Sequence, residues 1–162
     1  MYTTMTVEQI LEHKGSNVWS LGPSASVFDA LRFMAEKNVG AVLVLKDEKP
    51  VGIFSERDCL RRVILEGRDE HRTKLSDVMT PKVIGVRLDD KIEICLALMM
   101  ENAIRHLPVL DGEGRVVGFV SIGDVAKELA AEQKFLIDQL VSYISGERKK
   151  PSLPEASNVS FP

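Results

Sequence analysis

The residues most suggestive of chemistry are a serine and an aspartate three positions apart, which the sequence carries twice. Ser55 and Asp58 follow one apolar run, and Ser121 and Asp124 follow another. At a helix start this spacing is typical of a capping box, although the acid there is usually Glu or Gln. The same groups can also bind a ligand: the serine hydroxyl and helix N-terminus face a phosphate, and the carboxylate accepts hydrogen bonds from a ribose. The residues alone leave both interpretations open.

A second candidate is the cationic pair Arg105-His106, at the start of a predicted strand. Arginine offers a planar set of donors for phosphate, and histidine adds another donor. The alternative is an exposed arginine beside a hydrogen-bonded histidine. The first copy has Gly40-Ala41 at the matching positions, so we expect two unequal sites and firmer phosphate binding in the second. The first copy instead carries Arg57, Arg61 and Arg62 on or near the start of its second helix. For Arg61 and Arg62 we expect a solvated helix face.

These motifs lie in an internal repeat, because residues 18–58 align with residues 83–124 when one turn residue is added. Each copy predicts a short extended segment, an amphipathic helix capped by Ser24 or Asp89, a hairpin, and a second helix beginning at the motif serine. The hairpin strands are apolar on both faces, which predicts a covered sheet. The predicted strand pairs are 41–45 with 51–54 and 107–110 with 116–120. Short helices at 7–11 and 75–79 precede the two copies.

One copy is too small to bury a comfortable core by itself. We therefore predict one α+β module in which two β-α-β-β-α repeats, related by a pseudo-twofold axis, pack sheet against sheet and leave two clefts. The predicted repeats are residues 5–68 and 75–145. Residues 146–162 are polar and contain Pro and Ser, and we expect this tail to be disordered.

The composition excludes several classes of function. A formal net charge of −3 gives no drive toward nucleic acid or anionic membranes, and no apolar run approaches the roughly 20 residues that a membrane span needs. The N-terminus resembles neither a signal nor a transit peptide, so we expect a cytoplasmic protein. No catalytic motif or metal-ligand spacing is present, so we predict no enzyme activity, no catalytic residue and no metal site.

The two cysteines are far apart in the sequence and have no CxxC spacing. Cys95 lies on the apolar face of a predicted helix, which favours a buried side chain. Cys59 has arginine neighbours that could lower its thiol pKa. A redox-linked regulator acting through Cys59 is therefore one alternative function.

The repeated Gly-h-h-Ser-x-x-Asp segments (h, hydrophobic), at 52–58 and 118–124, together with Arg-His-Leu-Pro-Val at 105–109, resemble tandem cystathionine β-synthase (CBS) domains, the Bateman module. The resemblance spans about residues 5–146 and is strongest to small stand-alone proteins made of one such pair. It implies a non-catalytic sensory protein that binds AMP, ADP, ATP, NAD(H) or S-adenosylmethionine between its repeats, with AMP favoured. It also implies ribose binding by Asp58 and Asp124. The residues it implies near phosphate are Ser55, Ser121, Arg105 and His106.

The resemblance further implies that the adenine lies against the segment opening the other repeat. That segment supplies Thr80 and Val83 to the Asp58 cleft, and Lys14 and Val18 to the Asp124 cleft. A homodimer and an effector protein of unknown identity are also implied. The apolar stripe that begins at Val125 could serve the dimer or pack on its own module. The other alternative function is an interaction or dimerisation module with vestigial clefts.

Overall fold

The structure is a computed structural model that describes residues 5–145, so the predicted tail at 146–162 lies outside the described residues. Contacts divide the chain into two compact units, residues 1–125 and residues 126–162. Both hairpins and both Ser-x-x-Asp motifs belong to the first unit. The second unit contains most of the last helix.

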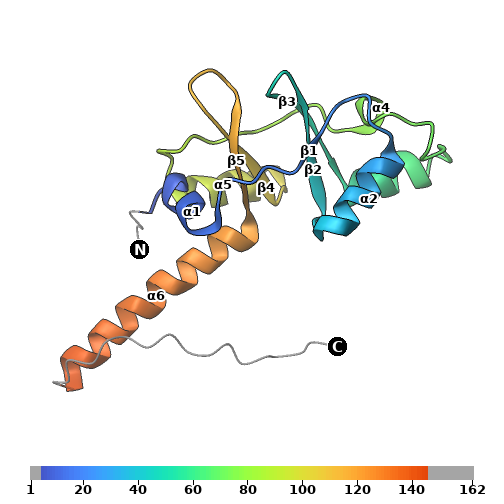
Figure 1. Cartoon of the computed structure of the whole chain (residues 1–162). Helices are drawn as coiled ribbons and strands as arrows, with labels where there is room; N and C mark the ends of the chain where they lie inside the picture. The colour runs from blue at the N-terminus through green and yellow to red at the C-terminus, as the bar shows by residue number, and fades with distance from the viewer. Residues whose placement is uncertain (1–4, 146–162) are drawn as a thin grey trace. The chain divides into compact units, whose positions relative to one another are not determined.

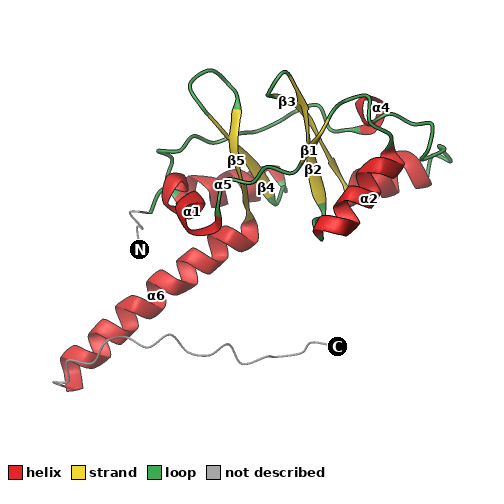
Figure 2. Ribbon diagram, in the orientation of Figure 1, coloured by secondary structure: helices red, strands yellow, loops and turns green. Residues whose placement is uncertain are grey.

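The elements follow the predicted order in both halves, as Figures 1 and 2 show. The first half contains α1 (Val7–Lys14), β1 (Ser20–Leu21), α2 (Val27–Lys37), β2 (Ala41–Lys46), β3 (Lys49–Ser55), α3 (Glu56–Asp58) and the π-helix η1 (Cys59–Ile64). The second half contains α4 (Leu75–Val78), α5 (Ile92–Asn102), β4 (His106–Leu110), β5 (Val116–Ser121) and α6 (Ile122–Ser145). The predicted hairpins and second helices are therefore confirmed.

The two sheets differ in their first strand. In the first repeat β1 pairs in parallel with β2, and β2 pairs antiparallel with β3, giving the order β1-β2-β3. In the second repeat β4 and β5 form a two-stranded antiparallel sheet. The segment that matches β1 there makes an isolated parallel bridge, Val86 to Val109. The β-α-β-β-α pattern is thus complete in the first repeat and shortened in the second.

The core of the first repeat forms where the buried face of α2 meets the sheet. Val27, Ala30 and Met34 follow the helical spacing and are at most 3% exposed. They pack with Val42 and Phe54 of the hairpin in one cluster of buried residues. The apolar spacing of the helix and the strands, visible in the sequence, therefore produces this core.

The helix that precedes each repeat packs on the other repeat. The N–H of Val7 in α1 donates to the carbonyl of Asp90 at 2.9 Å, which fixes α1 to the second repeat. The N–H of Leu75 in α4 donates to the carbonyl of Ala25 at 2.9 Å, which fixes α4 to the first repeat. Figure 1 shows α1 beside β5 and α4 beside α2. This exchange brings Lys14, the last residue of α1, to the second Ser-x-x-Asp motif, and Thr80, two residues after α4, to the first.

The predicted starts of the first long helices were wrong by two residues. The N-cap of α2 is Ser26, whose Oγ accepts from the N–H of Asp29 at 3.0 Å, and the residue before α5 is Lys91. Ser24 lies in the turn that precedes α2. Asp89 lies in the turn before α5, where the neighbouring Asp90 accepts from the N–H of Arg87. Short polar residues stabilise such turns as readily as helix caps, so the sequence could not separate the two.

Candidate functional site

The first motif and the segment after α4 form one hydrogen-bonded group, the Asp58 cluster (Ser55, Asp58 and Thr80). Thr80 adds to the edge of β3, because its N–H and carbonyl bond the carbonyl and N–H of Ile53 at 2.8 and 2.9 Å. Its Oγ1 then donates to Oδ1 of Asp58 at 3.0 Å. The structure therefore brings together the predicted pair Asp58 and Thr80, which are far apart in the sequence.

Ser55 and Asp58 also form a capping box at the start of α3. Oδ2 of Asp58 accepts from the N–H and Oγ of Ser55, both at 3.0 Å, and Ser55 Oγ accepts from the N–H of Asp58 at 3.2 Å. The carboxylate is only 8% exposed. The capping interpretation is thus correct, and the cap holds the carboxylate in a fixed orientation against Thr80.

The second motif forms the Asp124 cluster (Lys14, Arg105, His106, Ser121 and Asp124). Lys14, the last residue of α1, places Nζ 2.6 Å from Oδ2 of Asp124 and 2.7 Å from the carbonyl oxygen of Phe119. The same carboxylate oxygen accepts from the N–H of Ser121 at 2.8 Å, while Ser121 Oγ accepts from the N–H of Asp124 at 3.1 Å. The predicted pair Lys14 and Asp124 therefore also meets, here as an ion pair.

The cations of this second cluster affect the protonation of its other members. Burial opposes ionisation of Asp124, but the hydrogen bonds of Lys14 and Ser121 and the charge of Lys14 together outweigh it and lower the pKa of the carboxyl. His106 stacks on Phe119 with ring centroids 5.4 Å apart. Burial, followed by the charges of Lys14 and Arg105, lowers the pKa of His106. At neutral pH the cluster therefore holds two cations, one carboxylate and an uncharged histidine.

The lowered pKa of His106 predicts a loss of stability in mild acid. The folded protein binds a proton at this ring less readily than the unfolded chain does, so stability falls as pH drops below the ordinary histidine value of about 6.5. We expect the thermal unfolding midpoint to fall further between pH 7.5 and 5.5 in the unmodified protein than in His106→Gln. His71→Gln, at an exposed histidine, is the matched control. Equal slopes for the unmodified protein and His106→Gln would contradict this.

The other predicted residues are less closely tied to the two carboxylates. Val18 and Val83 are half-buried, and in the described part of the chain no hydrogen bond joins either one to its predicted aspartate. Arg105 is exposed, and within residues 5–142 its side chain forms no ion pair, although its carbonyl accepts from the N–H of Ile122 at 2.8 Å.

Arg62 is a structural residue that the sequence analysis missed. Its Nη1 donates to the carbonyls of Val78 and Met79, at 3.3 and 2.8 Å. These carbonyls immediately precede Thr80, so Arg62 holds in place the segment that reaches Asp58. A solvated face was the expectation for this arginine, and no local sequence signal indicates its distant carbonyl partners.

The structure contradicts the idea that arginines activate Cys59. The residue is 7% exposed, and burial, followed by the charge of Glu70, raises the pKa of its thiol. Burial also raises the pKa of Cys95, to about 11. Thiols of this kind are mostly protonated at neutral pH, which disfavours nucleophilic or redox chemistry.

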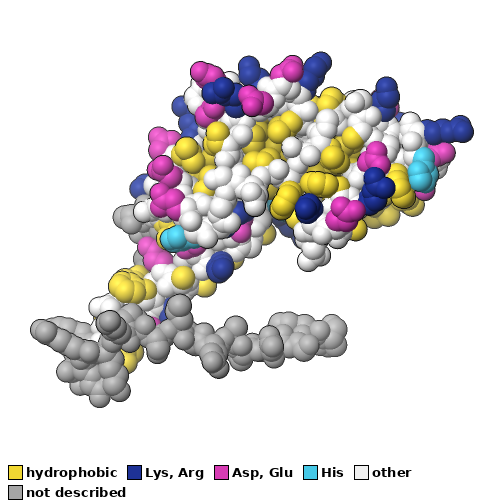
Figure 3. Space-filling view, in the orientation of Figure 1, with side chains coloured by type: hydrophobic (Ala, Val, Ile, Leu, Met, Phe, Trp, Pro, Cys, Tyr) yellow, Lys and Arg dark blue, Asp and Glu magenta, His cyan; other side chains and the backbone are white. Residues whose placement is uncertain are grey.

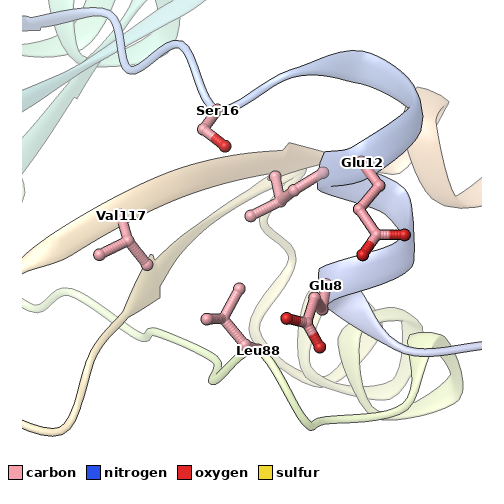
Figure 4. Close-up of a pocket in the computed structure, with 6 residues that line it drawn as sticks. Glu8, Glu12, Ser16, Leu88 and Val117 are labelled. Carbon is pink, nitrogen blue, oxygen red and sulfur yellow. The ribbon is translucent and has the colours of Figure 1, made fainter.

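A pocket of about 300 Å³ lies between α1 and β5 (Figure 4) and shares no lining residue with either cluster. It is lined by Glu8, Leu11, Glu12, Ser16, Leu88 and Val117, none of which was predicted as a site residue. The carboxylates of Glu8 and Glu12 disfavour an anionic ligand there. No group of three His, Cys, Asp or Glu side chains suited to a metal ion occurs among the described residues. No described helix is both long and apolar enough to cross a membrane.

Comparison with protein families identifies both halves of the chain. The family model described as "CBS domain" matches residues 4–65 and again residues 75–131. A CBS domain-containing protein of Arabidopsis thaliana, CBSX3, named as mitochondrial, is 35% identical over 155 residues, covering 90% of this chain and 74% of that protein.

Solved structures give the same fold. A protein with CBS domains from Burkholderia ambifaria MC40-6 is 41% identical and superposes with a TM-score of 0.75, covering 80% of this chain and 96% of that one. The protein PAE2072 of Pyrobaculum aerophilum, solved in complex with AMP, is 24% identical with a TM-score of 0.68, covering 78% of this chain and 99% of that one. The second likeness concerns the fold alone.

Proposed function

The chain belongs to the CBS domain family, and on that premise we propose that it is a non-catalytic regulatory module that binds an adenosine nucleotide. The observation that carries the proposal is the meeting of Lys14 with Asp124, beside Arg105 and His106. A fixed carboxylate suits the two hydroxyls of a ribose, and the neighbouring cations suit a phosphate. AMP is the favoured ligand, NAD(H) is the next candidate, and ADP, ATP and S-adenosylmethionine are further ones.

In this proposal Lys14 changes partner when the ligand binds. In the structure, the carboxylate of Asp124 accepts from the ammonium group of Lys14 at 2.6 Å. When the nucleotide binds, the ribose hydroxyls donate to this carboxylate instead. The ammonium group then turns to the phosphate, which carries more negative charge. Because Lys14 ends α1 and Asp124 begins α6, the ligand joins parts of the chain that are distant in sequence. It thereby favours one arrangement of the module, which an effector protein reads as a population shift.

Support from the relatives is of a general kind. The Pyrobaculum protein with the same fold holds AMP, which agrees with an adenosine ligand for this chain. Family membership alone does not select the nucleotide. The charges of Lys14 and Arg105 favour a ligand with a phosphate group over an uncharged nucleoside.

A second candidate function is an interaction or dimerisation module. It is favoured by large apolar side chains that α6 exposes, among them Phe135, Leu136, Ile137, Leu140 and Val141. Hydrophobic side chains are visible along this helix in Figure 3. Apolar surface of this kind marks protein contacts, and we propose a homodimer through this helix. Nucleotide binding and dimerisation are compatible, so the two candidates differ only in whether the Ser-x-x-Asp motifs bind a ligand.

A thermal unfolding screen with AMP, ADP, ATP, NAD⁺, NADH and S-adenosylmethionine tests the proposal. A ligand at 100 times its Kd stabilises the folded state by about 2.7 kcal/mol, which raises Tm by roughly 5–10 °C for a chain of this size. We expect such a rise with AMP, and its absence in the double variant Asp58→Ala/Asp124→Ala. No rise with any of the six ligands would leave the interaction module as the function and the motifs as helix caps.

A further inference from the structure

The two repeats place one pair of residues at the same point beside each motif. The N–H of Glu56 donates to the carbonyl of Gly40 at 3.0 Å, and the N–H of Ile122 donates to the carbonyl of Arg105 at 2.8 Å. Residues 40 and 105 therefore occupy the same position, against the first residue of the helix that carries the motif aspartate. One repeat has no side chain there, whereas the other has a cation.

At a second pair of equivalent positions, the first repeat has the arginine and the second repeat has the glycine. Residues 57 and 123 are the second residues after the motif serine, and they are arginine in the first repeat and glycine in the second. A Cβ added at Gly123 would lie 3.6 Å from Oγ of Ser121, so a side chain at this position starts beside the motif serine. The repeats thus each carry one arginine and one glycine at these two positions, in reversed order.

Of the charged side chains near the first motif, those of Glu56 and Arg62 already have defined contacts. The carboxylate of Glu56 lies 3.7 Å from where a Cβ of Gly40 would be, so an acid lies beside the position from which the Arg105 side chain extends in the second repeat. The guanidinium group of Arg62 is held by two carbonyls. Arg57 is exposed, and in the part of the chain that the structure describes its side chain forms no hydrogen bond or ion pair. Arg61, one turn further along the same helical segment, is also exposed.

We propose that Arg57 binds the phosphate of the nucleotide in the Asp58 site, the role that the proposed function gives to Arg105 in the Asp124 site. The inference rests on the proposed function and names a specificity-determining residue for its first site. In the Asp58 site the phosphate is then bound by a helix residue, Arg57. The acid Glu56, at the start of the same helix, directs its carboxylate to the Gly40 position before the strand. The Asp124 site holds phosphate from the strand, with an apolar residue (Ile122) at the start of the helix. Both sites select phosphorylated adenosine ligands, through different residues.

The test compares AMP with adenosine, which lacks the phosphate, in a chain with one working site. In Asp124→Ala only the Asp58 site remains, and equilibrium titration gives its Kd for each probe. Adding Arg57→Gln is expected to weaken AMP binding roughly 10- to 100-fold, the range for a lost hydrogen bond to a charged group. Adenosine binding should stay unchanged. Arg61→Gln, at an exposed arginine one turn further along the same helical segment, is the matched control and should leave both affinities unchanged.

A reciprocal test uses Asp58→Ala, in which only the Asp124 site remains. Arg105→Gly should weaken AMP binding there, and adding Gly123→Arg should restore most of it. No recovery would contradict the equivalence of the two positions.

Unchanged AMP affinity in Asp124→Ala/Arg57→Gln, or an equal loss for adenosine, would overturn the inference while leaving the proposed function intact. Binding of neither probe by the unmodified protein would instead overturn AMP as the ligand of the proposed function, and the inference with it.

Discussion

Replacing Gly52 by valine is expected to lower the free energy of unfolding by about 3 kcal/mol, which corresponds to a fall of roughly 6–12 °C in Tm. Gly52 lies on β3 where the segment after α4 crosses it. A Cβ at this position would overlap the side chain of Met79 and come 3.0 Å from the carbonyl oxygen of Thr80. A backbone atom cannot rotate away, so the whole segment must move.

The same substitution should also disturb the Asp58 cluster, because the displaced segment carries Thr80. We therefore expect weaker nucleotide binding by the first site in addition to the lower Tm. Gly112→Val is the matched control, since nothing lies within 4 Å of a Cβ there and its φ is not positive. A Gly52→Val protein as stable as Gly112→Val would show that this crossing is not closely packed.

Replacing Asp124 by alanine is expected to weaken AMP binding by the second site at least about 100-fold. In the proposed complex the carboxylate accepts two hydrogen bonds from the ribose, each contributing about 1.5–3 kcal/mol as a bond to a charged group. The substitution also removes the ion-pair partner of Lys14 at 2.6 Å. Isothermal titration of AMP into the variant measures the loss directly.

Asp89→Ala, at an exposed aspartate in the loop before α5, is the control for this substitution. It removes the same carboxylate charge from the surface and should leave AMP affinity unchanged. Equal affinities in Asp124→Ala and the unmodified protein would show that the carboxylate serves only as the cap of α6.

The duplicated unit could be predicted from the sequence because its signals are local. Short runs that are apolar on both faces indicated both hairpins, helical spacing indicated the long helices, and the motif serines marked the starts of α3 and α6. The pairing of Asp58 with Thr80 and of Asp124 with Lys14 was expected from the family resemblance, and the structure brings both pairs together. Their roles in binding remain proposals.

The contacts that cross between repeats could not be predicted from the residues alone. The exchange of α1 and α4 depends on backbone hydrogen bonds between distant segments, such as that of Val7 with Asp90, and any residue can make these. The partners of Arg62 are also backbone carbonyls. Nearby arginines in the sequence left open a lowered pKa for Cys59, whereas burial dominates in the fold and raises it.

The duplication places the same Ser-x-x-Asp cap at two positions in the fold. Each Ser-x-x-Asp pair caps its own helix, and the cap fixes the carboxylate toward a residue brought in by the exchanged short helix. The two sites then differ in their neighbours: Asp58 meets the hydroxyl of Thr80, whereas Asp124 meets the ammonium of Lys14. Under the proposed function, these different neighbours predict unequal ligand preferences for the two sites.

The most direct measurement is a crystal structure of the protein grown with AMP. The account predicts AMP with its ribose hydroxyls within hydrogen-bond distance of the Asp124 carboxylate, its phosphate beside Arg105, and the ammonium group of Lys14 moved from the carboxylate to the phosphate. AMP bound only elsewhere, as in the pocket between Glu8 and Leu88, with Lys14 still paired to Asp124, would contradict it.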